Sequence, residues 1–368
     1  MSRRKTLTRI AAARLLATVP VLATHHSAAQ SNTVKVGLIL FLTGPFASTG
    51  RQLEAGAPDQ AKRIAQELIV NDKVSVLGGF SLTPLALAVA PLATQSKTPA
   101  VVFVAATSSV IDASPYFIRS SFTLPQVTIG VAEWAPCNGF KKVVTLVSDY
   151  GPGIDAETAF KNRFTLNGGQ VQAALRVPFK SPDFAPFLQR VRDEKPDALF
   201  VFLPAGVGSQ LMKQFAERGL DKAGIKLIAT GDVTEDDIFN EMGDVALGVV
   251  TCHHYSASHP SAMNKKFVEA FARANDGKRA NYMAVAAYDG MHIIYNALRT
   301  TNGVTGDALL AAMKGQTFES PRGQILINAQ TRDIVQDVYI RKVEKKDGQL
   351  YNMEFDVLKS VNDPGRKN

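Results

Sequence analysis

Hydrophobic residues gather in short continuous runs along the chain, and these runs alternate with segments in which apolar residues recur at helical spacing. Such runs predict strands that are buried on both faces, because a half-exposed strand would show polar alternation. The predicted strands are Val34–Leu42, Val74–Leu77, Ala100–Val104, Val143–Val147, Val171–Val177, Ala198–Leu203, Lys226–Ala229 and Gly248–Cys252. Alternation with helices is typical of parallel sheets covered on both faces. We therefore predict an α/β fold.

Helices and late β segments complete this pattern. Pro58 is suited to the first turn of a helix. The predicted helices are Ala61–Val70, Pro84–Gln95, Phe267–Ala274 and Ala284–Leu298, and the late β segments are Pro321–Ile327 and Val335–Val343. The chain has 368 residues, 46% of them hydrophobic and 20% charged, which is enough for two lobes. Because no linker separates the lobes, we expect the chain to cross between them more than once.

The N-terminus predicts an export signal. Residues 1–14 are basic, residues 15–24 are apolar, and small residues occupy positions 27–29. This order is typical of a secretory signal peptide, and we expect cleavage after Ala29. The apolar stretch of about ten residues is too short for a membrane span, which needs roughly 20. Arg3-Arg4 resembles a twin-arginine start, but Thr6 stands where that pattern prefers an aromatic, so Sec export is favoured.

Charge and cysteine content fit an exported protein. Residues 1–29 hold five basic residues and no acid, so the formal charge of +8 falls to +3 without them. The remaining basic residues are scattered, so no nucleic-acid partner is predicted. Later segments are too short to span a membrane, and lipidation is not expected because no Cys follows the apolar run. Cys137 and Cys252 are expected as two buried thiols rather than a disulfide.

Sequence motifs of enzymes are largely missing. Gly151–Ala156 matches the dinucleotide-binding fingerprint loosely, but the next strand ends at Pro178–Lys180 without the acid that would hold a ribose. This favours a tight strand-to-helix turn over NAD binding. We found no P-loop, no zinc-protease helix, no nucleophile elbow and no nucleophile–base pair. We therefore expect neither catalysis nor a cofactor.

Two polar clusters have ordinary structural interpretations. His253 and His254 are adjacent on a strand, so their side chains should point to opposite faces, and one metal site would rarely take both. We interpret them, together with His259, as loop or cleft-lining residues, and we predict no metal site. Glu235–Asp237 is interpreted as the first turn of a helix, where carboxylates suit the helix dipole.

Several strand ends predict an anion site. The turns Thr43–Ser48, Gly79–Thr83 and Ala105–Ser109 are small, rich in hydroxyls and placed before helices. Free N–H groups at helix N-termini suit a carboxylate, and ligands of open α/β sheets bind at the carboxyl ends of strands. N-capping alone would also explain each turn. In the second lobe, Tyr150 and Asp232 follow strands and could complete a clamp for a zwitterion, or could serve as surface turn residues.

These segments together resemble the type I periplasmic binding proteins, specifically the leucine/isoleucine/valine-binding family of ABC importers. The resemblance covers essentially all of the chain after the signal. It implies two doubly wound α/β lobes, joined by three crossings, that close on a small ligand. The segments that carry it are VKVGLILFLTGPFASTG (34–50), the GGFS turn, PAVVFVAATSS (99–109), KKVVTLVSDYGPG (141–153), FAPFLQRVRDEKPDALFVF (184–202) and AAYDGMHIIYNAL (286–298).

The resemblance also implies ligand contacts. Ser81 matches the hydroxyl that binds a ligand carboxylate, and Ala105 and Thr107 match positions that hold the two charged groups of an amino acid. Tyr150 matches the second-lobe aromatic, and Asp232 falls where amino-acid binders place an acid for the ammonium, one carbon shorter than the usual Glu. Amino-acid binders often carry an aromatic where this chain has Leu203-Pro204-Ala205. The other predicted ligand-binding residues are Phe80, Ala106, His254 and Met283.

The resemblance further implies domain limits and one departure. The N-terminal lobe is expected at 30–121 and 256–335, and the C-terminal lobe at 122–255 and 336–368. About thirty residues of the family pattern, a helix-and-strand step, are missing after Ala57. The direct join to Pro58 still permits a right-handed crossover. We expect a first lobe without its edge strand and part of its first helix, with an exposed sheet face and lowered stability or affinity.

The predicted function is a monomeric solute-binding component of an ABC importer in the periplasm. It would bind a branched-chain or other apolar amino acid and deliver it to a permease in the inner membrane, without catalysis. An alternative keeps the fold and replaces the ligand with an aromatic or aliphatic carboxylate that lacks an amine. A second alternative is a ligand-sensing domain of a receptor, which a neighbouring kinase or receptor gene would favour over transport.

Overall fold

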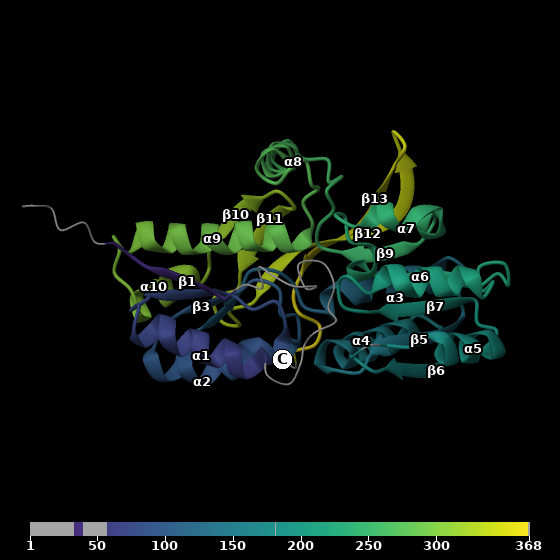
Figure 1. Ribbon diagram of the computed structural model, residues 1–368, viewed down its shortest axis with the longest axis horizontal. Helices are drawn as coiled ribbons and strands as arrows, with labels where there is room; N and C mark the ends of the chain where they lie inside the picture. The colour runs from purple at the N-terminus through teal and green to yellow at the C-terminus, as the bar shows by residue number, and fades with distance from the viewer. Residues whose placement is uncertain (1–32, 40–56, 181, 367–368) are drawn as a thin grey trace, which may run out of the picture. The chain divides into compact units, whose positions relative to one another are not determined.

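The computed structural model describes residues 33–39, 57–180 and 182–366 (Figure 1). The predicted signal sequence, the Thr43–Ser48 turn and the segment that precedes the join at Ala57 lie outside the described residues. Residues from Val34 onward form one unit by their contacts, so the predicted lobe limits stay a prediction. No helix in the described ranges is long and apolar enough to cross a membrane.

The first sheet is parallel, with the strand order β1-β2-β3-β4. Its strands are β1 (Val36–Ile39), β2 (Val76–Gly79), β3 (Ala100–Val102) and β4 (Phe117–Arg119). Alternate side chains of the strands enter two cores. Leu77 and Val102 pack against α1 (Ala57–Val70) and α2 (Thr83–Ser96). Val76 and Val101 pack against α9 (Tyr282–Thr300) and α10 (Asp307–Met313), which confirms helices on both faces (Figure 1).

Among the described residues, the second sheet has nine strands in the order β10-β11-β12-β9-β8-β7-β5-β6, and β13 pairs with β12. Its parallel part confirms the predicted strands: β5 (Lys142–Ser148), β6 (Gln170–Val177), β7 (Ala198–Phe202), β8 (Lys226–Thr230) and β9 (Val250–His253). The late strands join it antiparallel: β10 (Thr317–Ser320), β11 (Gly323–Ile327), β12 (Ile334–Lys346) and β13 (Gln349–Val361).

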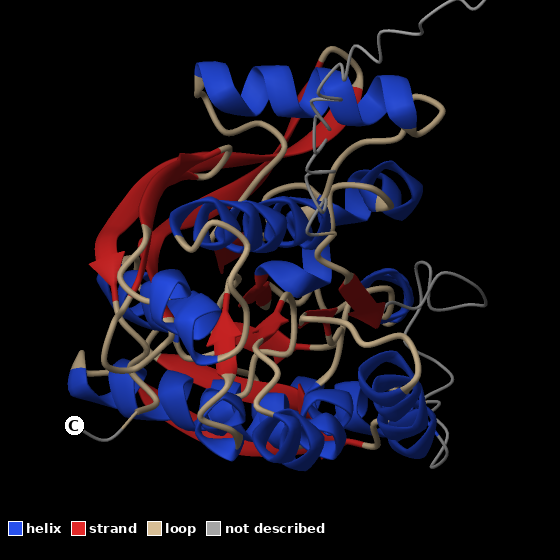
Figure 2. Cartoon of the chain, turned by 90° about the vertical axis from the view of Figure 1, so that its left-hand side faces the viewer, coloured by secondary structure: helices blue, strands red, loops and turns tan. Residues whose placement is uncertain are grey.

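Helices cover both faces of the parallel part of this sheet as well. Figure 2, in which the side of the molecule with the first sheet faces the viewer, shows helices (blue) on either side of strands (red). One face packs against α3 (Gln126–Cys137) and α4 (Gly151–Leu166), where Phe160 stacks on Phe200 with ring centroids 4.0 Å apart. The helices on the other face are α5 (Ala185–Glu194), α6 (Gly208–Glu217) and α7 (Phe239–Met242). The remaining helices are α8 (Ala262–Ala274) and the 3₁₀ turns η2 (Ser108–Ala113), η3 (Gly231–Thr234) and η4 (Gly243–Ala246).

The turn from β5 into α4 explains the glycines of the dinucleotide-like motif. A Cβ atom at Gly153 would lie 1.8 Å from the carbonyl oxygen of Ser148, so the helix can start this close to the strand only with glycine there. The tight strand-to-helix turn predicted for this segment is confirmed.

Both cysteines are free, but only Cys252 is buried; Cys137 is exposed, so the prediction of two buried thiols is wrong for it. Cys137 is the last residue of α3 and follows directly on its last buried residues, Ala135 and Pro136. Within the described residues, β1 pairs only with β2 and is an edge strand. The strand expected to be missing beside it stays a prediction.

Candidate functional site

The turn after β2 places Phe80 beneath the loop that follows β3. A Cβ atom at Gly79 would lie 2.2 Å from the carbonyl oxygen of Ile39, and both Gly79 and Phe80 have positive φ. In this conformation the fully buried Phe80 accepts a hydrogen bond from the amide of Ala105 at 2.9 Å. Ser81 follows, half-buried, before α2 begins. The tight turn therefore joins two of the predicted ligand-binding segments.

The segment Ala105–Thr107, called the 105–107 loop below, is hydrogen-bonded to several other segments of the chain. The carbonyl oxygens of Ala105 and Thr107 accept hydrogen bonds from the Arg119 guanidinium at 2.5 Å and 2.8 Å. The carbonyl of Ala106 accepts from the amide of Leu124 at 3.0 Å. The Thr107 hydroxyl lies 2.7 Å from that of Thr83 in α2. The loop is therefore buried and hydrogen-bonded to β4, to α2 and to the segment after β4.

The start of α4 meets this loop. A Cβ atom at Gly151 would lie 3.1 Å from the Thr107 hydroxyl oxygen, and the amide of Ser108 donates to Asp155 in α4 at 2.9 Å. Tyr150 precedes the helix, with its ring centroid 4.4 Å from that of Phe179. The structure thus brings together the predicted segments at the ends of β3 and β5.

Asp232 lies on η3, and its carboxylate is buried beside hydroxyl groups. It accepts hydrogen bonds from Thr230 at 2.9 Å and from Tyr282 at 3.2 Å. Burial raises the pKa of Asp232 to about 6, although both hydrogen bonds lower it. Burial also raises the pKa of Tyr150 well above its usual range, and the nearby charge of Asp232 adds to this rise. The predicted pair, Tyr150 and Asp232, is therefore electrostatically coupled.

The two adjacent histidines lie on one side of the chain, contrary to the prediction. Their ring centroids are 4.4 Å apart, and both rings contact Phe122 and Tyr282. Strand β9 ends at His253, so the alternation of a strand no longer applies to His254. Burial lowers the pKa of each imidazole well below its usual range. Within the described residues, none of the four ring nitrogens has a hydrogen-bond partner.

The interpretation of Glu235–Asp237 as the first turn of a helix is also wrong. Helix α7 begins only at Phe239, and Glu235 and Asp236 are buried. Glu235 accepts a hydrogen bond from the amide of Gly206 at 2.5 Å, and burial raises its pKa well above the usual range. Glu235 thereby holds the segment that follows β7, where Ala205 packs near the site.

The remaining predicted residues join the same core. Ala106 and the partly buried Met283 pack in one cluster with Phe122, Tyr150 and Tyr282. Among the described residues, no group of three or more His, Cys, Asp or Glu side chains could hold a metal ion. The sequence interpretation missed Arg119, Phe122, Phe179 and Tyr282. Asn281, which caps α9 by accepting from the amides of Met283 and Ala284, was the one local signal near Tyr282.

Comparisons with known proteins agree with this architecture. A sequence model described as periplasmic binding protein matches residues 54–349. Leu/Ile/Val-binding protein homolog 6 of Brucella abortus (strain 2308) is 41% identical over 372 residues, covering 93% of this chain and 95% of that protein.

The solved structures that are similar to this chain include two with a bound aromatic acid. One is a solute binding protein of an ABC transporter from Rhodopseudomonas palustris BisB5 in complex with 3,4-dihydroxybenzoic acid. It is 55% identical, with a TM-score of 0.87, covering 91% of this chain and 99% of that chain. The other, from R. palustris HaA2 in complex with p-hydroxybenzoic acid, is 40% identical, with a TM-score of 0.86, covering 90% and 98%.

Proposed function

The chain belongs to the periplasmic binding protein family, as a solute-binding protein of the leucine/isoleucine/valine type that serves ABC transporters, and we propose that its ligand is a hydroxylated aromatic carboxylate. The family functions outside the cytoplasm and delivers small molecules to a membrane permease. The aromatic acid is the alternative ligand of the sequence analysis, and it now takes precedence over a branched-chain amino acid. The expected monomer, the signal sequence at 1–29 and the lack of catalysis stay part of this proposal.

One observation carries the choice of ligand. The R. palustris protein that is 55% identical to this chain was solved with 3,4-dihydroxybenzoic acid. The side chains around the candidate site suit such a molecule, because flat rings favour offset-stacked or edge-to-face contact with other aromatic rings. Phe122, Tyr150, Phe179 and Tyr282 supply rings there.

We assign the two ends of the ligand to the two sides of the site. The hydroxyl of Ser81 and the amides of Ala106 and Thr107 would bind the carboxylate, as helix N-termini and short turns do for anions. Asp232 and the imidazoles of His253 and His254, whose ring nitrogens make no hydrogen bond among the described residues, would accept hydrogen bonds from ring hydroxyls. His253 Nε2 also lies 3.8 Å from Asp232 Oδ2. Asp232 already takes hydrogen bonds from two hydroxyl groups, so a phenolic hydroxyl would be a donor of the same kind.

Thermal unfolding of the purified protein against a panel of acids tests this proposal. Binding to the folded state alone stabilises it by about 2.7 kcal/mol at a ligand concentration a hundredfold above Kd. We expect the midpoint to rise with 3,4-dihydroxybenzoate or 4-hydroxybenzoate and to stay unchanged with leucine, isoleucine or valine. A rise with the amino acids alone would refute the aromatic ligand.

A branched-chain amino acid is the second candidate, because the Brucella relative is named as a Leu/Ile/Val-binding protein homolog. The substitution Asp232→Ala distinguishes the two candidate ligands, because it should affect their binding to different extents. Only an ammonium group needs the full charge of that carboxylate, so the variant should abolish binding of an amino acid. Binding of 4-hydroxybenzoate should weaken only by the loss of one hydrogen bond, and binding of benzoate, which has neither an amine nor a hydroxyl, should be nearly unchanged.

A further inference from the structure

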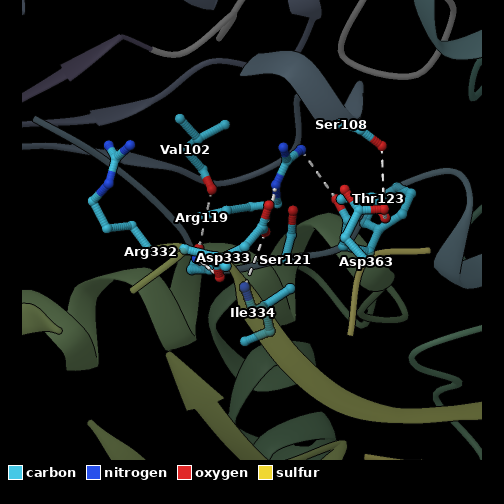
Figure 3. Close-up of polar contacts among 12 residues, drawn as sticks. Val102, Ser108, Arg119, Ser121, Thr123, Arg332, Asp333, Ile334 and Asp363 are labelled. Atoms are coloured by element: carbon cyan, nitrogen blue, oxygen red, sulfur yellow. Dashed lines mark hydrogen bonds and ion pairs between the residues drawn. The ribbon is translucent and has the colours of Figure 1, made fainter. Parts of the chain in front are cut away.

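The guanidinium of Arg119 connects three separate parts of the chain. Arg119 is the last residue of β4 and is fully buried. Two of its nitrogens donate to the carbonyls of Ala105 and Thr107, and one of them also reaches the carbonyl of Phe122 at 3.3 Å. Its Nε donates to Asp333 Oδ1 at 2.8 Å (Figure 3). These partners lie in the 105–107 loop, after β4, and just before β12.

Asp333 fixes the guanidinium at the other end. It is buried, and its Oδ1 also accepts a hydrogen bond from the amide of Ile334 at 3.0 Å. The backbone amide of Arg119 donates in turn to the carbonyl of Arg332 at 3.1 Å. Both the side chain and the main chain of Arg119 are hydrogen-bonded to this segment. The guanidinium that binds the 105–107 loop therefore has little freedom to rotate.

We infer that Arg119 is a positioning residue for ligand binding: it sets the place of the 105–107 loop through the loop's carbonyl oxygens, without contacting the ligand itself. This inference rests on the proposed role of that loop as the carboxylate-binding segment. A guanidinium can do this because its planar fork supplies five donors in fixed directions, whereas a lysine ammonium is a single point of charge. The amide of Ala105 already donates to Phe80, and the Thr107 hydroxyl pairs with that of Thr83, so the amides of Ala106 and Thr107 are the donors of this loop that remain for a ligand.

The substitution Arg119→Lys tests the inference while keeping the buried positive charge beside Asp333. Arg322→Lys is the matched control. Arg322 is equally buried, pairs with Asp289 and donates to Ser121 and Gln336 in the same region, but none of these contacts involves the 105–107 loop. A general effect of losing a buried guanidinium should therefore occur in both variants.

Two measurements follow, and the first needs no ligand. Hydrogen exchange followed by mass spectrometry should show the amides of residues 103–110 exchanging at least fivefold faster in Arg119→Lys than in Arg322→Lys. The second is Kd for 3,4-dihydroxybenzoate, which should rise at least tenfold in Arg119→Lys and less than threefold in Arg322→Lys. If Arg119→Lys does not fold, Asp333→Asn, which removes the charge that anchors the guanidinium, should shift both readouts in the same direction.

The outcomes separate this inference from the proposed function. Equal exchange of residues 103–110 in the two variants would overturn the inference, and so would a loosened loop that leaves Kd unchanged. If the wild-type protein binds neither 3,4-dihydroxybenzoate nor 4-hydroxybenzoate, the proposed ligand is refuted. The exchange measurement still decides whether Arg119 positions the loop.

Discussion

Replacing Asp232 by Asn should stabilise the ligand-free protein at neutral pH, and the gain should depend on pH. The carboxyl is buried with a pKa of about 6, whereas its ordinary value is 3.8. The folded protein therefore binds this proton more tightly than the unfolded chain does. The contribution of this carboxyl to the free energy of unfolding is fully present below pH 3.8, where it is protonated in both states, and is lost as the pH rises to about 6. Asn carries no charge and avoids that loss.

The size of the effect follows from the shift. A difference of one pKa unit corresponds to 1.36 kcal/mol, so a rise from 3.8 to about 6 costs the folded wild type about 3 kcal/mol at pH 8. Asn also changes the hydrogen bonds from Thr230 and Tyr282, at about 1 kcal/mol each, but this contribution does not vary with pH in this range. The free energy of unfolding of Asp232→Asn, relative to wild type, should therefore increase by about 2–3 kcal/mol from pH 4 to pH 8.

Urea unfolding of both proteins at pH 4, 5, 6, 7 and 8 measures this difference. Asp289→Asn is an informative comparison, because burial raises the pKa of Asp289 to about 6 as well. Asp289 is paired with the buried Arg322, at 2.8 Å, so its substitution leaves an uncompensated cation and should cost about 3–5 kcal/mol at pH 7. A difference between Asp232→Asn and wild type that stays constant from pH 4 to pH 8 would refute the reasoning.

Four further predictions concern stability and accessibility. Phe160→Ala removes a buried ring that stacks on Phe200 and should cost about 3–5 kcal/mol in urea unfolding; a loss under 1 kcal/mol would contradict the packing described. Gly153→Ala should lower the urea midpoint more than Gly37→Ala, because Gly37 has no positive φ and a Cβ atom there would meet only side-chain carbons, at 3.1 Å or more; equal effects would argue against the close approach to Ser148. A thiol reagent should modify Cys137 alone in the native protein, since Cys252 is buried with its pKa raised to about 12 by burial, and both thiols in denaturant; fast reaction of two native thiols would be inconsistent with this core. If the first lobe lacks a helix-and-strand step, the protein should melt below the similar R. palustris proteins and bind a dye for apolar surface; an equal midpoint without dye binding would speak against the shortened lobe.

The order of strands and helices was predictable from the sequence because it depends on local patterns. A strand buried on both faces needs a continuous apolar run, and β5, β7 and β8 have one whatever lies beside them. The glycines that allow the close turn at the start of α4 are equally local. Together these segments also carried the resemblance to the family, and the family was confirmed.

The environment of single side chains depended on contacts between distant residues. Glu235 and Asp236 are buried because α7 begins only after them, at Phe239, and other segments pack over them. A run of three acidic residues in the sequence predicts neither of these features. The imidazoles of His253 and His254 lie together because β9 ends between them.

Arg119 shows the same limit most clearly. Its partners, Ala105, Thr107 and Asp333, are 14, 12 and 214 residues away in sequence, and an arginine at the end of an apolar strand gives no local sign of them. The pattern of apolar and polar residues thus determined which helices and strands form, because each element depends mainly on residues that are near one another in the sequence. Only tertiary packing decided which polar groups are buried away from water and which protein groups replace water as their hydrogen-bond partners. It therefore also decided which residues form the site.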